Sequence, residues 1–303
     1  MSMTNTEKFL AMGLHHLPKG RKVKVLVNEL DLLDETKVYL IKNLVNPFGT
    51  TSDPSFHNAN TCLAVQEVIG FTGGEVEIHY SNDSWKNAIK YAKENNIKVI
   101  GRSASFSFLG EEDEKIMQDF IDWGGIFIAS AGNDRNKDNA PTDVVNKYFI
   151  SVGCVFEPDN SESTVVVYSS LKLPSFEEGV SNTYTDTSGA QPQVLVVAAI
   201  MQSVYGMNKY QFEKWLIANG ITNVPNLEVG ERLMYVPVLE KVELCRFKIG
   251  STTALVKGQI ITLDQAPVVD EDTDRTLMPV RAVLEALGYT VKWNQATQEI
   301  SVY

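Results

Sequence analysis

Short apolar segments alternate with segments of helical periodicity through most of the first 220 residues. The segments 22–29, 97–100 and 126–130 are short, apolar and rich in β-branched residues. Runs of this kind are typical of parallel strands that are buried on both faces. Residues 84–95 instead place apolar side chains at helical spacing, and Ser84 is the expected N-cap. The alternation predicts an α/β fold with a doubly wound, mainly parallel sheet.

The same alternation predicts further helices and strands, and it stops near residue 240. We expect further helices at 58–69, 112–123, 188–204 and 209–219, and further strands at 76–80 and 147–155. Residues 242–303 differ, because they contain only short strand-like segments, one helix near 280–287 and a last strand that ends at Val302. We therefore expect two domains, residues 1–240 and a small α+β domain of residues 241–303.

The net charge of −11, from 38 acidic and 27 basic residues, restricts the classes of partner. Phosphate groups are bound by basic patches, so we expect no binding to nucleic acid or to an anionic membrane. The first 22 residues contain no long apolar run, so we expect neither a signal peptide nor a transmembrane helix. The expectation is a cytoplasmic protein, or one that is associated with a particle or released by lysis.

The three cysteines are Cys62, Cys154 and Cys245, and none lies in a CxxC pattern. Zinc sites in proteins commonly use closely spaced cysteines, so a zinc site is not expected here. An odd number of cysteines without a framework spacing favours buried free thiols, which fits a reducing compartment. We expect no bound metal and no cofactor.

Seven segments between residues 23 and 192 carry a more specific signal, because they occur in a fixed order. They are VKVLVNE at 23–29, HNAN at 57–60, SWKNAIKYAKENNIKVI at 84–100, IFIASAGN at 126–133, YFISVGCV at 148–155, VYSS at 167–170 and TSGAQP at 187–192. Together they resemble the motifs of the subtilisin-like serine peptidases, or subtilases, in which acid, His, Asn and Ser follow in that order. The resemblance extends from about Lys22 to about Leu239. It implies a subtilisin-type fold and an endopeptidase that hydrolyses peptide bonds through an acyl-enzyme.

The resemblance gives a catalytic role to each of four residues. Ser188 would be the nucleophile and His57 its general base, because a serine hydroxyl is a poor nucleophile at neutral pH without one. Glu29 would fix the tautomer of His57 and stabilise the imidazolium that forms. Asn133 would donate its side-chain amide to the oxyanion, and the backbone N–H of Ser188 would be the second donor.

A further segment would bind the substrate. An extended peptide can add as a strand to an exposed strand edge, and in subtilases it does so beside the S1 pocket. The matching stretch here is GRSAS at 101–105. The resemblance therefore implies that Ser103, Ala104 and Ser105 contact a protein or peptide substrate.

The chain departs from the family pattern at three positions. Glu29 stands where the family has Asp, and Asp31 is the alternative acid, since a shift of two residues keeps the same face of a strand. Asn60 replaces the second His of the family's HGTH motif. Asp186 replaces the Gly that precedes Thr-Ser, and so puts a negative charge beside Ser188. A competing hypothesis is a catalytically weak or inactive subtilase fold that acts as a binding or structural protein. A third is a peptidase that cleaves only itself or one partner.

The last part of the chain, residues 247–303, resembles a second family, the copper amine oxidase N-terminal domain. The resemblance lies in LDQAP at 263–267, RTLMPVR at 275–281, LEALGY at 284–289, VKWN at 291–294 and EISV at 299–302. It implies a stalk or attachment module of the kind found in bacterial surface and phage proteins, without a copper site. We expect either attachment to a surface or particle or a folding cap for the first domain, in a protein of bacterial or phage origin.

Overall fold

The chain divides into two compact units, which are described separately. The computed structural model describes residues 3–51, 57–106, 109–133, 143–155, 163–174, 182–224, 227, 231–239, 245–256, 259–270, 273, 275–286, 290–295 and 297–302. The first unit comprises Met1–Ser203 and Met207–Leu239, and the second comprises Val204–Gly206 and Glu240–Tyr303. No helix among the described residues is both long enough and apolar enough to cross a bilayer.

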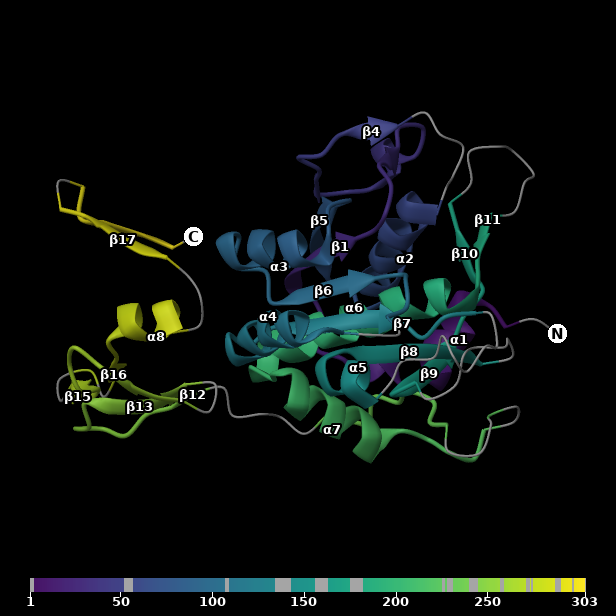
Figure 1. The fold of residues 1–303 in the computed structure, drawn as a ribbon. Helices are drawn as coiled ribbons and strands as arrows, with labels where there is room; N and C mark the ends of the chain where they lie inside the picture. Colours follow the sequence, from purple (N-terminus) through teal and green to yellow (C-terminus); the bar gives the residue numbers. More distant parts are fainter. Residues whose placement is uncertain are drawn as a thin grey trace. The chain divides into compact units, whose positions relative to one another are not determined.

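A parallel sheet forms the centre of the first unit. In the described part of the chain it has seven strands in the order β3-β5-β1-β6-β7-β8-β9 (Figure 1). In chain order these are β1 (Lys22–Asn28), β3 (Leu44–Val45), β5 (Glu75–Ser81), β6 (Val99–Arg102), β7 (Ile126–Ser130), β8 (Ile150–Val155) and β9 (Val165–Tyr168). Parallel neighbours require crossover connections, which explains the alternation of strands and helices along the chain. The predicted α/β class with a mainly parallel sheet is confirmed.

Helices cover both faces of this sheet. They are α1 (Asn5–Ala11), α2 (His57–Phe71), α3 (Trp85–Glu94), α4 (Glu111–Asp122), α5 (Asp143–Tyr148), α6 (Asp186–Tyr205) and α7 (Lys209–Asn219). Buried side chains of α3, α4 and α5 form one apolar cluster with Ile100 and Phe127 of the sheet. Because side chains alternate along a strand, Gly101 faces the opposite side, where a Cβ would lie 2.3 Å from Nε2 of Gln191 in α6.

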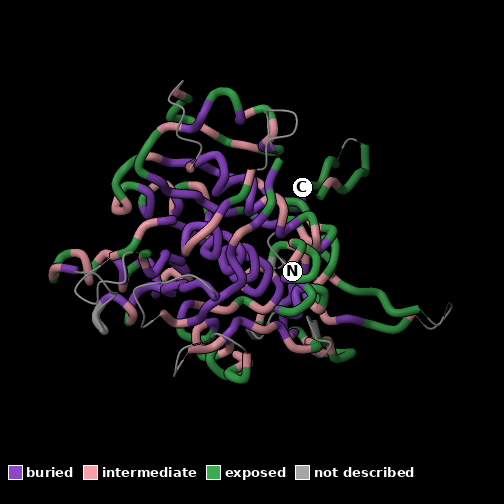
Figure 2. The backbone as a smooth tube through the Cα atoms, turned by 90° about the vertical axis from the view of Figure 1, so that its right-hand side faces the viewer, coloured by how far each residue is buried: buried purple, intermediate pink, exposed green. Residues whose placement is uncertain are grey.

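Helix α6 is the most buried helix of the first unit in the described part of the chain. Every residue from 187 to 200 is buried. Buried residues are drawn in purple in Figure 2, where they gather in the interior. A helix that is apolar all round is expected at the centre of a core rather than at its surface. At the surface, α3 begins as predicted, because Oγ of Ser84 accepts a hydrogen bond from the backbone N–H of Asn87 at 3.3 Å.

The prediction of one strand over 147–155 is wrong in its first part. Asp143–Tyr148 forms helix α5, and β8 begins only at Ile150. The buried residues Val145 and Tyr148 are three apart, so they share a helix face toward the core, and the Tyr148 hydroxyl donates to Glu114 at 2.8 Å. The helix is only six residues long, which is too short for its periodicity to stand out in the sequence.

Several short elements were not apparent from the sequence. They include the 3₁₀ turns Leu14–His16 and Val38–Leu40, and the strands β2 (Leu33–Asp34), β4 (Thr50–Thr51), β10 (Leu171–Leu173) and β11 (Asn182–Tyr184). Strand β2 pairs with β4, and β10 pairs antiparallel with β11, with Leu171 opposite Tyr184. This second pairing matters for the site, because β11 leads directly into α6.

The second unit is small and rich in short strands. Its elements are β12 (Cys245–Arg246), β13 (Thr253–Val256), β14 (Gln259–Thr262), β15 (Val268–Asp270), β16 (Arg275–Leu277), α8 (Val280–Ala286), β17 (Val291–Asn294) and β18 (Glu299–Val302). They form a three-stranded sheet, β12-β13-β14, and two hairpins, β15-β16 and β17-β18. Ala254, Val256, Leu263 and Val283 are the buried centre. The predicted helix near 280 and the final strand that ends at Val302 are both present.

Candidate active site

The candidate acid lies at the carboxyl end of the sheet. Strand β1 ends at Asn28, and the next residue, Glu29, is only 2% exposed. Neighbouring parallel strands present their carboxyl ends at one edge, so the end of β1 lies beside the end of β6. The backbone N–H of Ser103, just after β6, donates to Oε1 of Glu29 at 2.9 Å.

The environment of Glu29 favours it over the alternative acid. Burial raises the pKa of the Glu29 carboxyl, and the attraction to His57 and the hydrogen bonds from Ser103 offset only part of that rise. Asp31 is exposed, and its carbonyl oxygen accepts the hydroxyl of the buried Tyr80. Glu29 is therefore the carboxylate that lies close enough to His57 to act on it electrostatically.

The candidate nucleophile stands in the first turn of α6. This helix begins at Asp186, and Ser188 is 9% exposed. The Ser188 hydroxyl donates to the carbonyl oxygen of Ser103 at 3.4 Å. Ser103 thus bonds Glu29 through its N–H and Ser188 through its carbonyl. One residue after β6 links the candidate acid to the candidate nucleophile.

The candidate oxyanion donor follows β7. Asn133 is exposed, three residues after the strand ends at Ser130. Its Oδ1 accepts two hydrogen bonds from Thr187, one from the backbone N–H at 3.1 Å and one from the hydroxyl at 2.6 Å. Both bonds use the oxygen of the amide, and within the described part of the chain the two Nδ2 hydrogens have no acceptor. Thr187 precedes Ser188, which places this amide next to the nucleophile.

The candidate base begins α2 and has partners other than the expected ones. Nδ1 of His57 lies 3.3 Å from Oδ1 of Asn58, and Nε2 lies 3.3 Å from the hydroxyl of Tyr184. Within the described residues, neither ring nitrogen forms a hydrogen bond to Ser188 or to Glu29. The structure therefore brings the four predicted residues into one region, but the Ser188–His57–Glu29 hydrogen-bond chain is not formed in this conformation.

The predicted substrate-binding segment becomes more exposed along its length. Ser103 is buried, Ala104 is half-buried and Ser105 is exposed. The Ser103 side chain is already engaged, because its hydroxyl donates to Oε1 of Gln191 at 3.3 Å and lies 3.3 Å from the Thr61 hydroxyl. Among the three, Ala104 and Ser105 are the residues that a peptide can reach.

The comparisons with known proteins follow the division into two units. A family model described as the copper amine oxidase N-terminal domain matches residues 238–302.

The chain resembles a cold-adapted subtilisin-like serine proteinase with a TM-score of 0.52 and 16% sequence identity, over 70% of this chain and 88% of that one. It also resembles the prenylagaramide maturation protease PagA, with a TM-score of 0.51 and 17% sequence identity, over 74% of this chain and 90% of PagA. The third similar structure is fervidolysin from Fervidobacterium pennivorans, a keratinolytic enzyme related to subtilisin. Its TM-score is 0.50 and its sequence identity is 15%, over 67% of this chain and 39% of fervidolysin. The first unit has the subtilisin fold. None of the curated proteins matches this sequence.

Local contacts explain the departure from the subtilisin motifs at Asn60, whereas the backbone at Asp186 favours the residue of the motif over the one present. Asn60 is 7% exposed, and its Oδ1 accepts from Nζ of Lys37 at 3.1 Å and from Nδ2 of Asn182 at 3.0 Å. The Asn60 amide therefore joins α2 to β11, which is a structural contact. Asp186 has φ +58°, a left-handed conformation that favours the glycine of the subtilisin motif.

Sequence reasoning missed Tyr184, which lies at the centre of the site. Its ring meets the ring of His57 edge-on, with centroids 5.5 Å apart and an interplanar angle of 76°. Its hydroxyl lies 2.7 Å from that of Thr61, and Tyr184 itself is only 5% exposed. The available signal was its position four residues before Ser188, but this spacing has no meaning until β11 is known to run into α6.

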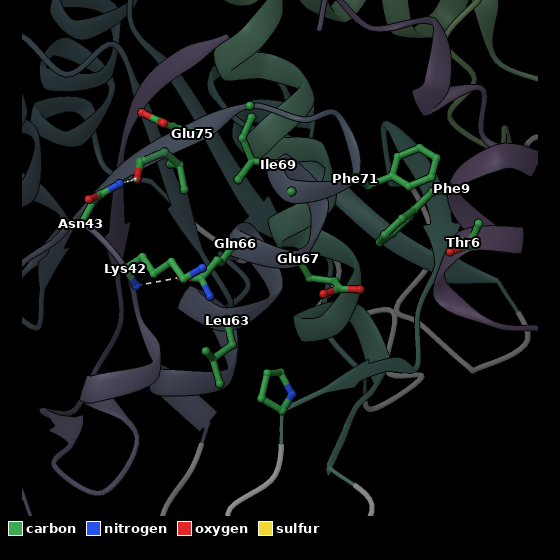
Figure 3. A pocket seen from close by; sticks show the side chains of 14 residues that line it. Thr6, Phe9, Lys42, Asn43, Leu63, Gln66, Glu67, Ile69, Phe71 and Glu75 are labelled. Atoms are coloured by element: carbon green, nitrogen blue, oxygen red, sulfur yellow. Dashed lines mark hydrogen bonds between the residues drawn. The ribbon is translucent and has the colours of Figure 1, made fainter. Parts of the chain in front are cut away.

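A separate cleft lies away from these residues. It has a volume of about 890 Å³ and is lined by side chains of α1, α2 and β5, including Phe9, Gln66 and Glu75 (Figure 3). The backbone N–H of Lys42 donates to Oε1 of Gln66 at its rim, at 2.7 Å. None of the candidate site residues lines this cleft, so the cleft is not the site of the proposed chemistry.

Across the described residues, no cluster of three or more His, Cys, Asp and Glu side chains could hold a metal ion.

Proposed function

We propose that this chain is a serine endopeptidase of the subtilisin type that cleaves peptide bonds through an acyl-enzyme. The observation that carries the proposal is the pair of hydrogen bonds from Thr187 to the amide oxygen of Asn133. They attach the amide to the residue before Ser188 and leave its N–H groups without an acceptor among the described residues, which suits an oxyanion hole. A merely structural asparagine at a turn would have no reason to present its donors next to a serine at a helix start.

The remaining residues supply the other parts of the reaction. The Ser188 oxygen would attack the carbonyl carbon of a peptide while His57 takes the hydroxyl proton. His57 would then give this proton to the leaving amine as the C–N bond breaks, which leaves an ester on Ser188. In the second half of the reaction, His57 would take a proton from the water that attacks the ester and return it to the Ser188 oxygen as the acid product leaves. Glu29 would stabilise the imidazolium, which is consistent with its buried carboxyl near His57. The negative charge on the carbonyl oxygen would be bound by Asn133 and by the backbone N–H of Ser188.

A binding or structural protein is the second candidate function, and one observation favours it. Both ring nitrogens of His57 have partners, Asn58 and Tyr184, that are neither nucleophile nor acid. A fold that had lost catalysis would tolerate such contacts, because nothing would then require His57 to meet Ser188.

Covalent labelling by a fluorophosphonate distinguishes the two functions, because the reagent reacts with a serine only when a base activates it. We expect labelling of the native chain, and loss of labelling in Ser188→Ala and in His57→Ala. His15→Ala is the matched control, since His15 is an exposed histidine outside the site. A folded native chain that stays unlabelled, together with an unlabelled set of variants, would support the binding function instead.

A further inference from the structure

The hydroxyl of Tyr184 lies among the side chains that the proposed reaction uses. It is 3.3 Å from Nε2 of His57 and 2.7 Å from the Thr61 hydroxyl. Both partners belong to α2, because His57 is its first residue and Thr61 lies one turn further on. The hydroxyl therefore occupies Nε2, one of the two ring nitrogens of the candidate base.

A nitrogen of a neutral imidazole makes only one hydrogen bond in the ring plane, because it carries either one proton or one lone pair. If Nε2 of His57 carries the proton, it donates to Tyr184 and cannot accept a proton from Ser188. If Nε2 carries the lone pair, Tyr184 donates to it and occupies the position that the Ser188 hydroxyl needs. In both tautomers, the contact with Tyr184 excludes the contact with Ser188.

The position of Tyr184 is fixed by packing from two sides. Tyr184 is the last residue of β11, opposite Leu171 of β10, and its backbone lies against the start of α6. A Cβ on Gly189 would lie 2.5 Å from the Tyr184 carbonyl oxygen, so only glycine at 189 permits this approach. The backbone N–H of Gly189 also donates to the carbonyl of Thr185, at 2.8 Å. The hydroxyl is thus held in the site by the strand, the helix and Thr61.

We propose that Tyr184 is a positioning residue that keeps His57 away from Ser188 in the resting protein. The inference rests on the proposed peptidase function and adds a condition to it. His57 and Ser188 come together only when the Tyr184 hydroxyl leaves Nε2 and remains bonded to Thr61.

The test compares fluorophosphonate labelling rates of the native chain with those of Tyr184→Phe. This change removes one oxygen and keeps the ring that packs on His57. We expect labelling to be about two- to tenfold faster, since the reaction no longer breaks one hydrogen bond. Thr61→Val removes the partner that holds the displaced hydroxyl away from Nε2, so it is expected to slow labelling. Tyr148→Phe is the matched control, because Tyr148 is a buried tyrosine whose hydroxyl bonds Glu114.

A second measurement follows the imidazole itself by ¹⁵N NMR. The chain has only four histidines, so the His57 signals can be assigned with His57→Ala. We expect the Nε2 resonance of His57 to move in Tyr184→Phe and to stay in place in Tyr148→Phe. A structural role for the tyrosine alone would change thermal stability without moving this resonance.

The outcomes separate the inference from the function on which it rests. If the native chain is labelled and Tyr184→Phe is labelled equally fast or more slowly, the inference is overturned while the peptidase function stands. If neither is labelled and the His57 resonance moves, the contact exists but the peptidase function fails, and the inference fails with it. If the resonance does not move, Tyr184 does not hold His57, and the inference is overturned whatever the labelling shows.

Discussion

The side-chain oxygen of Asn133 accepts two hydrogen bonds from Thr187, the residue immediately before Ser188. The candidate oxyanion donor is therefore held in place by the neighbour of the candidate nucleophile. We expect Asn133→Ala to lower kcat by about 10²–10³-fold, the range known for loss of this kind of donor in subtilisin. Urea unfolding should also show a loss of about 1–3 kcal/mol, because the backbone N–H and the hydroxyl of the buried Thr187 lose their acceptor. Thr187→Ser keeps both donors and should retain most of the activity. Equal losses in both variants would contradict this arrangement.

Replacing Glu29 by Gln should raise the stability of the fold at neutral pH and lower the activity. Burial raises its pKa above the ordinary 4.5, so the folded state binds the proton more tightly than the unfolded chain. The stability that this contributes is fully present below about pH 4.5 and is lost as the pH rises through the folded pKa. Glu29→Gln cannot ionise, so we expect it to be more stable than the native chain at neutral pH and equally stable near pH 4. Its activity should fall about 10⁴-fold, as for loss of a triad carboxylate.

Glu77→Gln provides the control of opposite sign for this pH dependence. The hydrogen bond with His79 lowers the pKa of Glu77, so its stabilisation is present above its ordinary pKa and is lost as the pH falls. Glu77→Gln should therefore lose stability at neutral pH and leave labelling of Ser188 unchanged. Urea titrations at several pH values measure both variants. A Glu29→Gln protein that is less stable than the native chain at neutral pH would contradict the prediction.

Asp186 should limit both the stability and the reactivity of the site. Its φ of +58° is strained for a residue with a Cβ, so Asp186→Gly should stabilise the fold by up to about 1 kcal/mol. Asp186→Asn tolerates the same backbone and removes only the charge beside Ser188. We expect it to accelerate fluorophosphonate labelling about two- to fivefold, since a nearby anion opposes the oxyanion. An effect of Asp186→Gly on rate without any effect of Asp186→Asn would assign the influence to the backbone instead.

The second unit should be separable from the chemistry of the first. Its buried centre contains few side chains, among them Val283 of α8, which is 8% exposed. Val283→Asp places a charge in this small core and should unfold the second unit. Labelling of Ser188 should remain as in the native chain, because the candidate residues all lie in the first unit. Calorimetry would show loss of one transition with the other unchanged, and a drop in labelling would contradict the separation.

Much of the fold could be predicted because its signals are local. The apolar runs of β1 and β7, the N-cap at Ser84 and the helix from Lys209 to Asn219 each follow from a few neighbouring residues. Helix α5 could not be predicted, since its six residues contain less than two turns of periodicity. The antiparallel pairing of β10 with β11 joins residues as far apart in sequence as Leu171 and Tyr184, and no local pattern marks it.

For the site, the order of the motifs identifies the residue types at the starts of α2 and α6 and at the end of β7. It points to His57, Asn133 and Ser188, and it leaves Glu29 and Asp31 as alternative acids at the end of β1. The folded chain shows that Glu29 is buried near His57 while Asp31 is exposed, and that the Tyr184 hydroxyl contacts Nε2 of His57. Such features escape a local pattern because burial and hydrogen bonding are set by segments far apart in the chain, which meet only when the sheet, α2, α6 and β11 have packed together.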